Sequence, residues 1–251
     1  MRGGANALDI LRRPRLPIGP VVRRLFGRHE RFISELYRGI FVDLGDLVAS
    51  IREHAQTPTT ILEIGCGDGM VTERIVHTFP DAAVTGIDIC TQPGRLYLGE
   101  RSRVRFLRLT AQDLATEHTR YQLVIIADVL HHVPYPEWAD FLSTARRLVA
   151  AGGTLILKDW VRQRTPAYLL GYLSDRFVTG DRIRYPHKHE LRALARETFG
   201  ADSIQGEFRV KPWNCNLGLV IAPAPSQSSP PPAFNPRTPK SSAIEPTSEL
   251  M

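Results

Sequence analysis

The sequence lacks the apolar runs and cysteine patterns that mark membrane-spanning and disulfide-stabilised proteins. None of its 251 residues belongs to an apolar run of about 18, which argues against a membrane-spanning helix. No apolar block with a small-residue cleavage site follows the N-terminus, which argues against a secretory signal. Cys66, Cys90 and Cys215 are too scattered for a disulfide framework or a Cys-x-x-Cys metal site. We therefore expect a cytoplasmic protein in a reducing setting.

Two common nucleotide-binding patterns are also incomplete. The dinucleotide fingerprint would need a glycine directly after Gly69, where the chain has Met70. A Gly-Lys-Ser or Gly-Lys-Thr sequence, which a phosphate-binding P-loop needs, does not follow the glycines. These gaps disfavour a nicotinamide oxidoreductase and a P-loop nucleotidase.

The positive charge is concentrated at the N-terminus. Residues 1–31 contain eight arginines against Asp9 and Glu30, which accounts for the whole net charge of +6. Prolines at positions 14, 17 and 20 prevent a continuous helix there. We expect residues 1–28 to be a basic extension packed loosely on the domain, with weak contact to a membrane surface as an alternative. Nucleic-acid binding is not expected, because Phe26 is the only aromatic platform in this segment.

The C-terminal end has the composition of a disordered tail. Residues 223–251 hold eight of the 19 prolines, together with many serines and threonines. The foldable domain is therefore expected over residues 29–222.

A strand, a glycine-rich turn and a helix follow one another over residues 61–79. Apolar residues interrupted by Glu63 predict a short buried strand, and residues 70–79 have helical apolar spacing. Gly65, Gly67 and Gly69 let the backbone turn tightly against a ligand. The N–H groups of the helix then point at whatever lies over the turn, as in doubly wound folds that bind nucleotide-like cofactors.

An acid followed by Gly-x-Gly-x-Gly resembles the first motif of the class I S-adenosylmethionine-dependent methyltransferases. The resemblance implies an α/β fold with a Rossmann-like, seven-stranded, mostly parallel sheet, an antiparallel last strand and helices on both faces. It also implies S-adenosyl-L-methionine as the cofactor, with Glu63 orienting its methionine end. Gly65, Cys66, Gly67 and Gly69 form the turn that approaches the cofactor closely.

Two further acids fit the later motifs of this family. Asp88 lies 19 residues beyond Gly69 at the end of a predicted strand over 82–89, where a carboxylate accepts from a ribose diol. The resemblance assigns Asp88 to the ribose and Asp113, after a strand over 104–109, to adenine, and the neighbouring Ile89 and Leu114 are also expected to bind the cofactor. The alternatives are a turn-initiating Asp88 and an Asp113 that caps a helix or turn.

The central strand over 121–127 leads into Asp128, His131 and His132. Ligands of open α/β sheets bind beyond the carboxyl ends of the strands, which places these residues near the reactive end of the cofactor. The stretch resembles the fourth motif of small-molecule methyltransferases and lacks the Asn-Pro-Pro-Tyr or Asp-Pro-Pro-Tyr of amino-methylating nucleic-acid enzymes. Either histidine could remove a hydroxyl proton. Alternatively, one histidine caps the loop and no base is needed, because positioning alone often suffices.

The remaining segments complete the expected domain. Residues 29–55 have helical spacing weakened by two glycines, so we expect one or two helices there. The resemblance places them over the substrate side of the cofactor pocket. They would form a helical cap (29–57) on the core of the domain (59–222). Simple coverage of the sheet is the alternative. We expect a helix over 138–150, a strand over 154–157, a helix over 187–199 and antiparallel strands over 203–210 and 214–221.

An aromatic and arginine-rich insertion over 161–186 is neither clearly helix nor strand, and it suits an acceptor pocket or an ordinary irregular lid.

These expectations favour methylation of a small organic acceptor, most simply at oxygen in a biosynthetic pathway, with no metal required. A macromolecular methyltransferase that docks on RNA or protein through residues 1–28 is one alternative. A non-catalytic subunit that binds the cofactor is the other. Neither the acceptor nor the oligomeric state follows from the residues.

Overall fold

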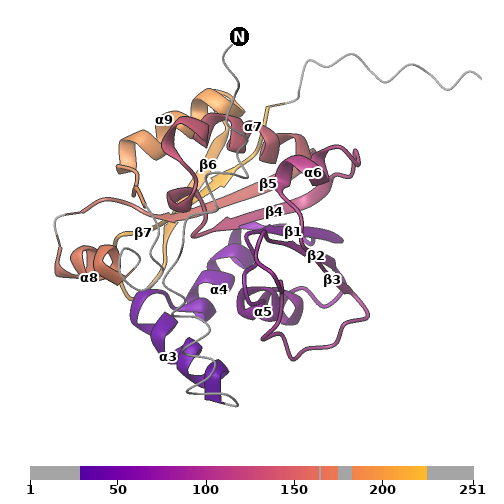
Figure 1. Cartoon of the computed structure of the whole chain (residues 1–251). Coiled ribbons are helices and arrows are strands. Elements are labelled where there is room, and N and C mark those ends of the chain that lie inside the picture. The colour runs from indigo at the N-terminus through magenta and orange to yellow at the C-terminus, as the bar shows by residue number, and fades with distance from the viewer. Residues whose placement is uncertain (1–28, 164, 175–182, 225–251) are drawn as a thin grey trace, which may run out of the picture.

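The central feature of the structure is a sheet of seven strands in the order β3-β2-β1-β4-β5-β7-β6 (Figure 1). The structure is a computed structural model, and it describes residues 29–163, 165–174 and 183–224. The strands are β1 (Thr60–Ile64), β2 (Ala83–Ile87), β3 (Val104–Leu107), β4 (Tyr121–Ala127), β5 (Val149–Trp160), β6 (Ile204–Arg209) and β7 (Asn216–Ile221). All neighbouring pairs are parallel except the two that β7 makes, with β5 and with β6. The predicted Rossmann-like sheet with an antiparallel last strand is confirmed.

Helices cover both faces of this sheet (Figure 1). One face carries α6 (Ala111–Ala115), α7 (Trp138–Leu148) and α9 (Lys188–Phe199), and the other carries α4 (Leu44–His54) and α5 (Met70–Thr78). Alternate strand residues serve the two cores: Leu62 and Ile64 pack toward α7, whereas Ile61 packs toward α4 and α5. Strand β4 is apolar along nearly its whole length, so its side chains on both faces of the sheet need an apolar core to pack against.

The N-terminal helical segment is divided into two helices, α3 (Glu30–Phe41) and α4. Val42 is extended, and the Asp43 carboxylate then accepts from the backbone N–H groups of Gly45 and Asp46, which caps α4. The interpretation that residues 29–55 form two helices is therefore the correct one.

Two expectations about local structure are wrong. The segment 161–186 contains a helix, α8 (Pro166–Ser174), whose first turn is capped by the Thr165 hydroxyl accepting from the Tyr168 N–H at 3.2 Å. Strand β5 begins at Val149 rather than at residue 154, because Val149 is extended and pairs with Tyr121. Helix α7 consequently ends at Leu148.

Several expectations lie outside the described residues, namely the basic extension over 1–28, the tail from 225 to 251, and positions 164 and 175–182 of the insertion. Within the described part of the chain, no helix has the length and apolar character needed to cross a membrane.

Candidate cofactor and acceptor site

The parallel strands end together and form one ligand edge of the sheet. Ile64 at the end of β1 pairs with Ile87 in β2 and with Ile126 in β4. The segments that follow these strands therefore meet at the same edge, where open α/β sheets bind their ligands. Asp88, Asp128 and His131 lie on these segments, and Lys158 and Asp159 lie on the neighbouring strand β5.

The glycine turn leaves open space over one of its glycines. A Cβ added to Gly65, at φ +79°, would lie 2.3 Å from the Val129 Cγ2 atom, so this glycine is required for packing. A Cβ on Gly67, at φ +51°, would meet no atom within 4 Å. Cys66 between them is buried, and its N–H donates to the Ile87 carbonyl at 3.0 Å. The turn thus offers room for a ligand directly above Gly67.

Asp88 links the end of β2 to the glycine turn. Its Oδ2 accepts from the Gly67 N–H and its Oδ1 from the Cys90 N–H, both at 2.8 Å. The hydrogen bond from the Cys90 N–H is the one expected if Asp88 initiates a turn. The hydrogen bond from the Gly67 N–H, by contrast, joins the Asp88 carboxylate to the glycine turn. Each oxygen retains capacity to accept from a further donor such as a ribose hydroxyl. Ile89 beside it is half exposed at the same edge.

Glu63 lies beneath the turn and faces α5. Its carboxyl group is buried and accepts from the Thr72 hydroxyl at 2.5 Å. Burial raises the pKa of Glu63 to about 8, although the Thr72 hydrogen bond opposes the shift. This position fastens α5 to β1, and direct contact with a bound ligand remains a prediction.

The residues predicted for adenine have local structural roles. The Asp113 Oδ2 accepts from the Thr110 hydroxyl at 2.7 Å and from the Thr110 N–H at 3.1 Å, which completes a capping box. These hydrogen bonds lower the pKa of Asp113. The Leu114 side chain is buried in the core beneath α6, and contact of this residue with the cofactor stays a prediction. Contact of Asp113 with adenine therefore remains a prediction, beside the capping role that the structure shows.

Asp128 forms a charged pair with a lysine of the neighbouring strand. The Lys158 Nζ atom donates to both carboxylate oxygens of Asp128 at 2.6 Å. The lysine side chain is 0% exposed and that of Asp128 is 31% exposed, so the pair connects the core to the edge. Asp128 also has a left-handed backbone at φ +57°, which is uncommon for a residue with a side chain.

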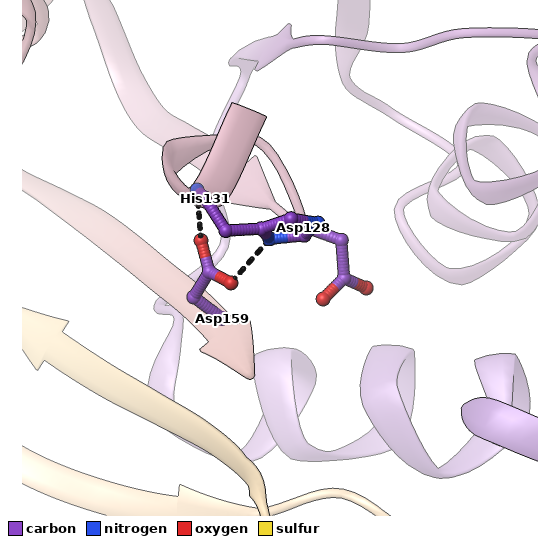
Figure 2. A group of neighbouring side chains, drawn as sticks. All are labelled: Asp128, His131 and Asp159. Carbon is purple, nitrogen blue, oxygen red and sulfur yellow. Dashed lines mark hydrogen bonds and ion pairs between the residues drawn. The ribbon is translucent and has the colours of Figure 1, made fainter. Parts of the chain in front are cut away.

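A buried histidine and aspartate form the second polar contact at this edge (Figure 2). His131, in the short helix η2 (Leu130–His132), places its Nδ1 2.6 Å from the Asp159 Oδ1. Its backbone N–H donates to Oδ2 of the same carboxylate at 3.2 Å. Burial opposes ionisation of Asp159, but the His131 and Lys158 charges outweigh it and hold the pKa of this carboxyl below its usual range.

The ionised Asp159 sets the tautomer of the His131 ring. An ionised carboxylate only accepts, so His131 donates its Nδ1–H to Asp159, and when the ring is neutral its lone pair lies on Nε2. His132, by contrast, is exposed, with its ring centroid 4.1 Å from that of His131. The structure thus pairs His131 with a buried carboxylate.

The ligand atoms of Asp128, His131 and Asp159 lie within 4.8 Å of one another, which is the spacing of a metal-binding group (Figure 2). However, the Lys158 ammonium already contacts both oxygens of Asp128, and His131 donates to Asp159. The donor set is therefore occupied by a cationic side chain and a hydrogen bond, which makes it a poor fit for a divalent cation.

Aromatic side chains surround the His131 side of the edge. Tyr185 lies 5.0 Å from the His131 ring, 5.9 Å from Trp160 and 5.6 Å from Tyr168 of α8, measured between ring centroids. Phe41 at the end of α3 packs edge-on against Trp160 at 5.9 Å. The described part of the insertion thus brings aromatic groups to the polar pair, as a pocket for an organic acceptor requires.

The sequence indicated Asp128 and His131 but not their partners. The partners, Lys158 and Asp159, are two adjacent charged residues at the end of an apolar strand. This feature of the sequence could have indicated them. A charged pair in a strand that is otherwise buried predicts partners within the fold, since buried charges are paired.

Comparison with known proteins agrees with this geometry. Residues 62–155 match the family model described as a methyltransferase domain. A trans-aconitate 2-methyltransferase of Streptomyces avermitilis is 32% identical over 203 residues, covering 69% of this chain and 72% of the relative. A ubiquinone biosynthesis O-methyltransferase of Nitrosomonas europaea is 28% identical over 149 residues, covering 55% and 61% respectively. The chain thus spans about three fifths of the length of this latter relative.

A solved structure shares the fold at low sequence identity. The 1,6-didemethyltoxoflavin-N1-methyltransferase of Burkholderia thailandensis, solved with S-adenosylhomocysteine, is 17% identical with a TM-score of 0.56, covering 88% of this chain and 91% of that one. Together with the glycine turn, the acid that contacts it and the antiparallel β7, these matches show that the chain belongs to the class I S-adenosylmethionine-dependent methyltransferases.

Proposed function

We propose that this protein transfers the methyl group of S-adenosylmethionine to a hydroxyl oxygen of a small organic acceptor, with His131 as the general base. The observation that carries the proposal is the 2.6 Å contact between the His131 Nδ1 and the buried Asp159, at the edge of the sheet that carries the glycine turn. The pair supplies a proton acceptor of fixed orientation where the acceptor would bind.

The residues of the glycine turn fit the cofactor. The open space over Gly67 admits a ligand against the backbone, and Asp88 has acceptor capacity left for a diol. When bound, S-adenosylmethionine supplies a methyl carbon whose bond to the sulfonium sulfur breaks as the acceptor oxygen attacks, with the electron pair remaining on sulfur. Gly67 and Asp88 would hold its nucleoside part.

His131 would take the hydroxyl proton on Nε2. Asp159 holds the ring through Nδ1–H and stabilises the imidazolium that forms, so the positive charge does not remain unpaired in a buried place. General-base assistance of this kind contributes roughly 10²–10⁴-fold to a rate. The trans-aconitate and ubiquinone relatives have names that indicate small-molecule acceptors, which supports an acceptor of that class here.

The proposal extends to the setting of the protein. Cys66 and Cys215 are buried free thiols, which supports a reducing, cytoplasmic compartment in which no disulfide is needed.

Calorimetric titration of the full chain tests the cofactor part. We expect S-adenosylmethionine and S-adenosylhomocysteine to bind and NAD not to bind. Asp88→Ala should abolish binding of both sulfur nucleotides, and Asp81→Ala, at an exposed position of the connection before β2, should leave it unchanged. Normal binding by Asp88→Ala would remove the assigned role of this carboxylate.

A screen of hydroxylated acceptors, followed by histidine variants, tests the base. His131→Ala should retain cofactor binding and lose at least about 10²-fold in kcat. His132→Ala should lose much less, and the exposed His77→Ala is the matched control. If His131→Ala keeps wild-type turnover and pH profile, His131 is not the base.

A further inference from the structure

Helix α3 turns its charged side chains toward the protein. Arg31 pairs with Glu73 of α5 at 2.6 Å, and Arg38 pairs with Asp68 of the glycine turn at 2.7 Å. Glu30 likewise pairs with Arg95, at 2.5 Å. In a surface helix of a water-soluble protein, the charged side chains normally face solvent. In α3 they form the contact with the rest of the domain.

The opposite face of α3 is apolar and exposed. Phe32, Leu36 and Ile40 follow one another at four-residue spacing, which places them on one side of the helix, and they are 67%, 63% and 44% exposed. Trp213, 37% exposed, continues this surface, because its indole N–H donates to the Ile40 carbonyl at 2.6 Å. We call these four residues the apolar stripe.

A second exposed apolar pair lies on α8. Leu169 and Leu170 are half exposed, and their neighbour Tyr168 packs against the cluster of Trp160 and Tyr185 that Phe41 of α3 also contacts. In Figure 1, α8 lies at the left of the view and α3 lies at the bottom. Both helices thus pack against the same aromatic cluster, and each carries exposed apolar side chains.

Strong positive charge directly precedes the stripe. Residues 1–28, which lead into α3, contain seven arginines and one aspartate. An apolar helix face with aromatic anchors beside a polybasic segment is the pattern of a helix that lies on an anionic membrane surface.

We propose that α3 docks the protein on an anionic lipid bilayer. The apolar stripe lies in the boundary between headgroups and acyl chains, and the arginines of residues 1–28 contact the acidic headgroups. Trp213 has an apolar ring and a polar N–H, which suits this boundary. The proposal goes beyond methyl transfer and does not depend on the identity of the acceptor.

A second copy of the chain fits the stripe less well. A symmetric dimer would bring two segments of net charge +6 close together. The stripe consists of three side chains of α3 and Trp213 of the β6–β7 connection, whereas stable interfaces bury about 800 Å² on each partner. A bilayer matches both the apolar side chains and the charge.

The docked orientation would turn the ligand edge toward the bilayer. Arg38 of α3 contacts Asp68 in the glycine turn, and Phe41 contacts Trp160 beside the His131 pair. A lipid-associated acceptor would then reach the site from the membrane side.

Vesicle flotation with the full chain tests the proposal. Vesicles of phosphatidylcholine alone are compared with vesicles containing about 30% phosphatidylglycerol, in about 0.1 M salt. We expect at least about tenfold stronger partitioning to the anionic vesicles. The double variant Phe32→Gln/Leu36→Gln should partition at least about tenfold more weakly than the wild type. Leu98→Gln, which alters a 75% exposed leucine outside the stripe, should remain within about twofold of the wild type.

A charge variant and a fold control complete the test. Arg12→Gln/Arg13→Gln/Arg15→Gln should lower partitioning to anionic vesicles by at least about tenfold. Because Phe32 and Leu36 are exposed, the double variant should keep the wild-type far-ultraviolet circular dichroism spectrum.

Three results would overturn the proposal. The first is that the wild type does not bind anionic vesicles. The second is that Phe32→Gln/Leu36→Gln binds these vesicles as strongly as Leu98→Gln does. The third is that light scattering shows a concentration-dependent dimer of the wild type that the double variant does not form. The last of these would assign the stripe to a second copy of the chain.

Discussion

At the scale of single residues, the site contains two charge contacts with different roles. The Asp128–Lys158 pair joins β4 to β5, whereas the His131–Asp159 pair orients an imidazole at the edge. In both pairs one member is fully buried, on β5, so removal of its partner leaves a charged or polar group in a medium of low dielectric constant.

Asp159→Asn tests whether the aspartate acts through His131. The amide removes the negative charge that stabilises the imidazolium, so we expect kcat to fall by roughly 10²-fold or more. Cofactor affinity should stay unchanged, and the pH dependence of kcat should shift, since the neutral amide no longer favours the protonated ring. Rates across pH and calorimetry would show this; an unaltered pH profile would assign Asp159 a structural role only.

The Asp128–Lys158 pair predicts unequal costs for its two single variants. Asp128→Asn removes the carboxylate that contacts the fully buried Lys158 ammonium directly and should lower the free energy of unfolding by about 3–5 kcal/mol. Lys158→Met leaves the partly exposed Asp128 carboxylate, which water can solvate, and should cost only about 1–3 kcal/mol. Urea unfolding of both variants at pH 7 measures the difference, and the opposite order would contradict the assigned burial.

Glu63 predicts a dependence of stability on pH. Its folded-state pKa is raised from 4.5 to about 8, so the folded state holds a proton that the unfolded state loses. Stability from this group is therefore present below the unfolded pKa of 4.5 and is lost as the pH rises toward 8. The loss is on the order of 3–5 kcal/mol for a shift of this size.

The variant Glu63→Gln keeps an acceptor for Thr72 and should remove this loss. We expect its unfolding free energy to decline less than that of the wild type between pH 5 and 8. Parallel slopes of the two proteins in denaturant titrations would show that Glu63 is ionised in the folded state.

At the scale of elements, two glycines of the glycine turn have different roles, one in packing and the other in cofactor binding. Gly65→Ala should destabilise the fold by several kcal/mol, because its Cβ would lie 2.3 Å from Val129 and its φ is +79°. Gly67→Ala meets no neighbour, so it should cost only about 1–2 kcal/mol from its φ of +51° but should weaken cofactor binding, since its Cβ enters the open space. Thermal unfolding and calorimetry of both variants distinguish the two glycines; unchanged cofactor affinity in Gly67→Ala would show that the ligand does not approach this position.

At the scale of the whole molecule, one sheet separates two apolar cores. Ile75 of α5 lies in one core and Leu142 of α7 lies in the other, and both are buried. Because each strand contributes to both cores, the described part of the chain should unfold as one unit. Ile75→Ala and Leu142→Ala should each cost about 2–5 kcal/mol and shift a single transition seen equally by circular dichroism and tryptophan fluorescence. Two separate transitions would contradict this coupling.

Much of the fold and part of the site could be predicted from the sequence. The glycine spacing, the apolar run of β4 and the two closing strands predicted the sheet, because local periodicity and turn residues act over short distances. The start of β5 and helix α8 were not predicted. Val149 is extended because it pairs with Tyr121 of β4, a contact between residues far apart in the sequence, and α8 depends on the Thr165 cap in a segment of mixed composition.

The sequence alone determined the family, the parallel sheet with its antiparallel last strand, and the position of Asp88, His131 and the glycines at one edge, since parallel strands present their carboxyl ends together. Only the tertiary structure decided that His131 contacts the buried Asp159, that Lys158 neutralises Asp128, and that α3 directs its apolar face outward. The physical reason is that these features are pairings across the fold. A side chain's charge partner and its exposure depend on which strands and helices pack together, and local sequence pattern does not specify them.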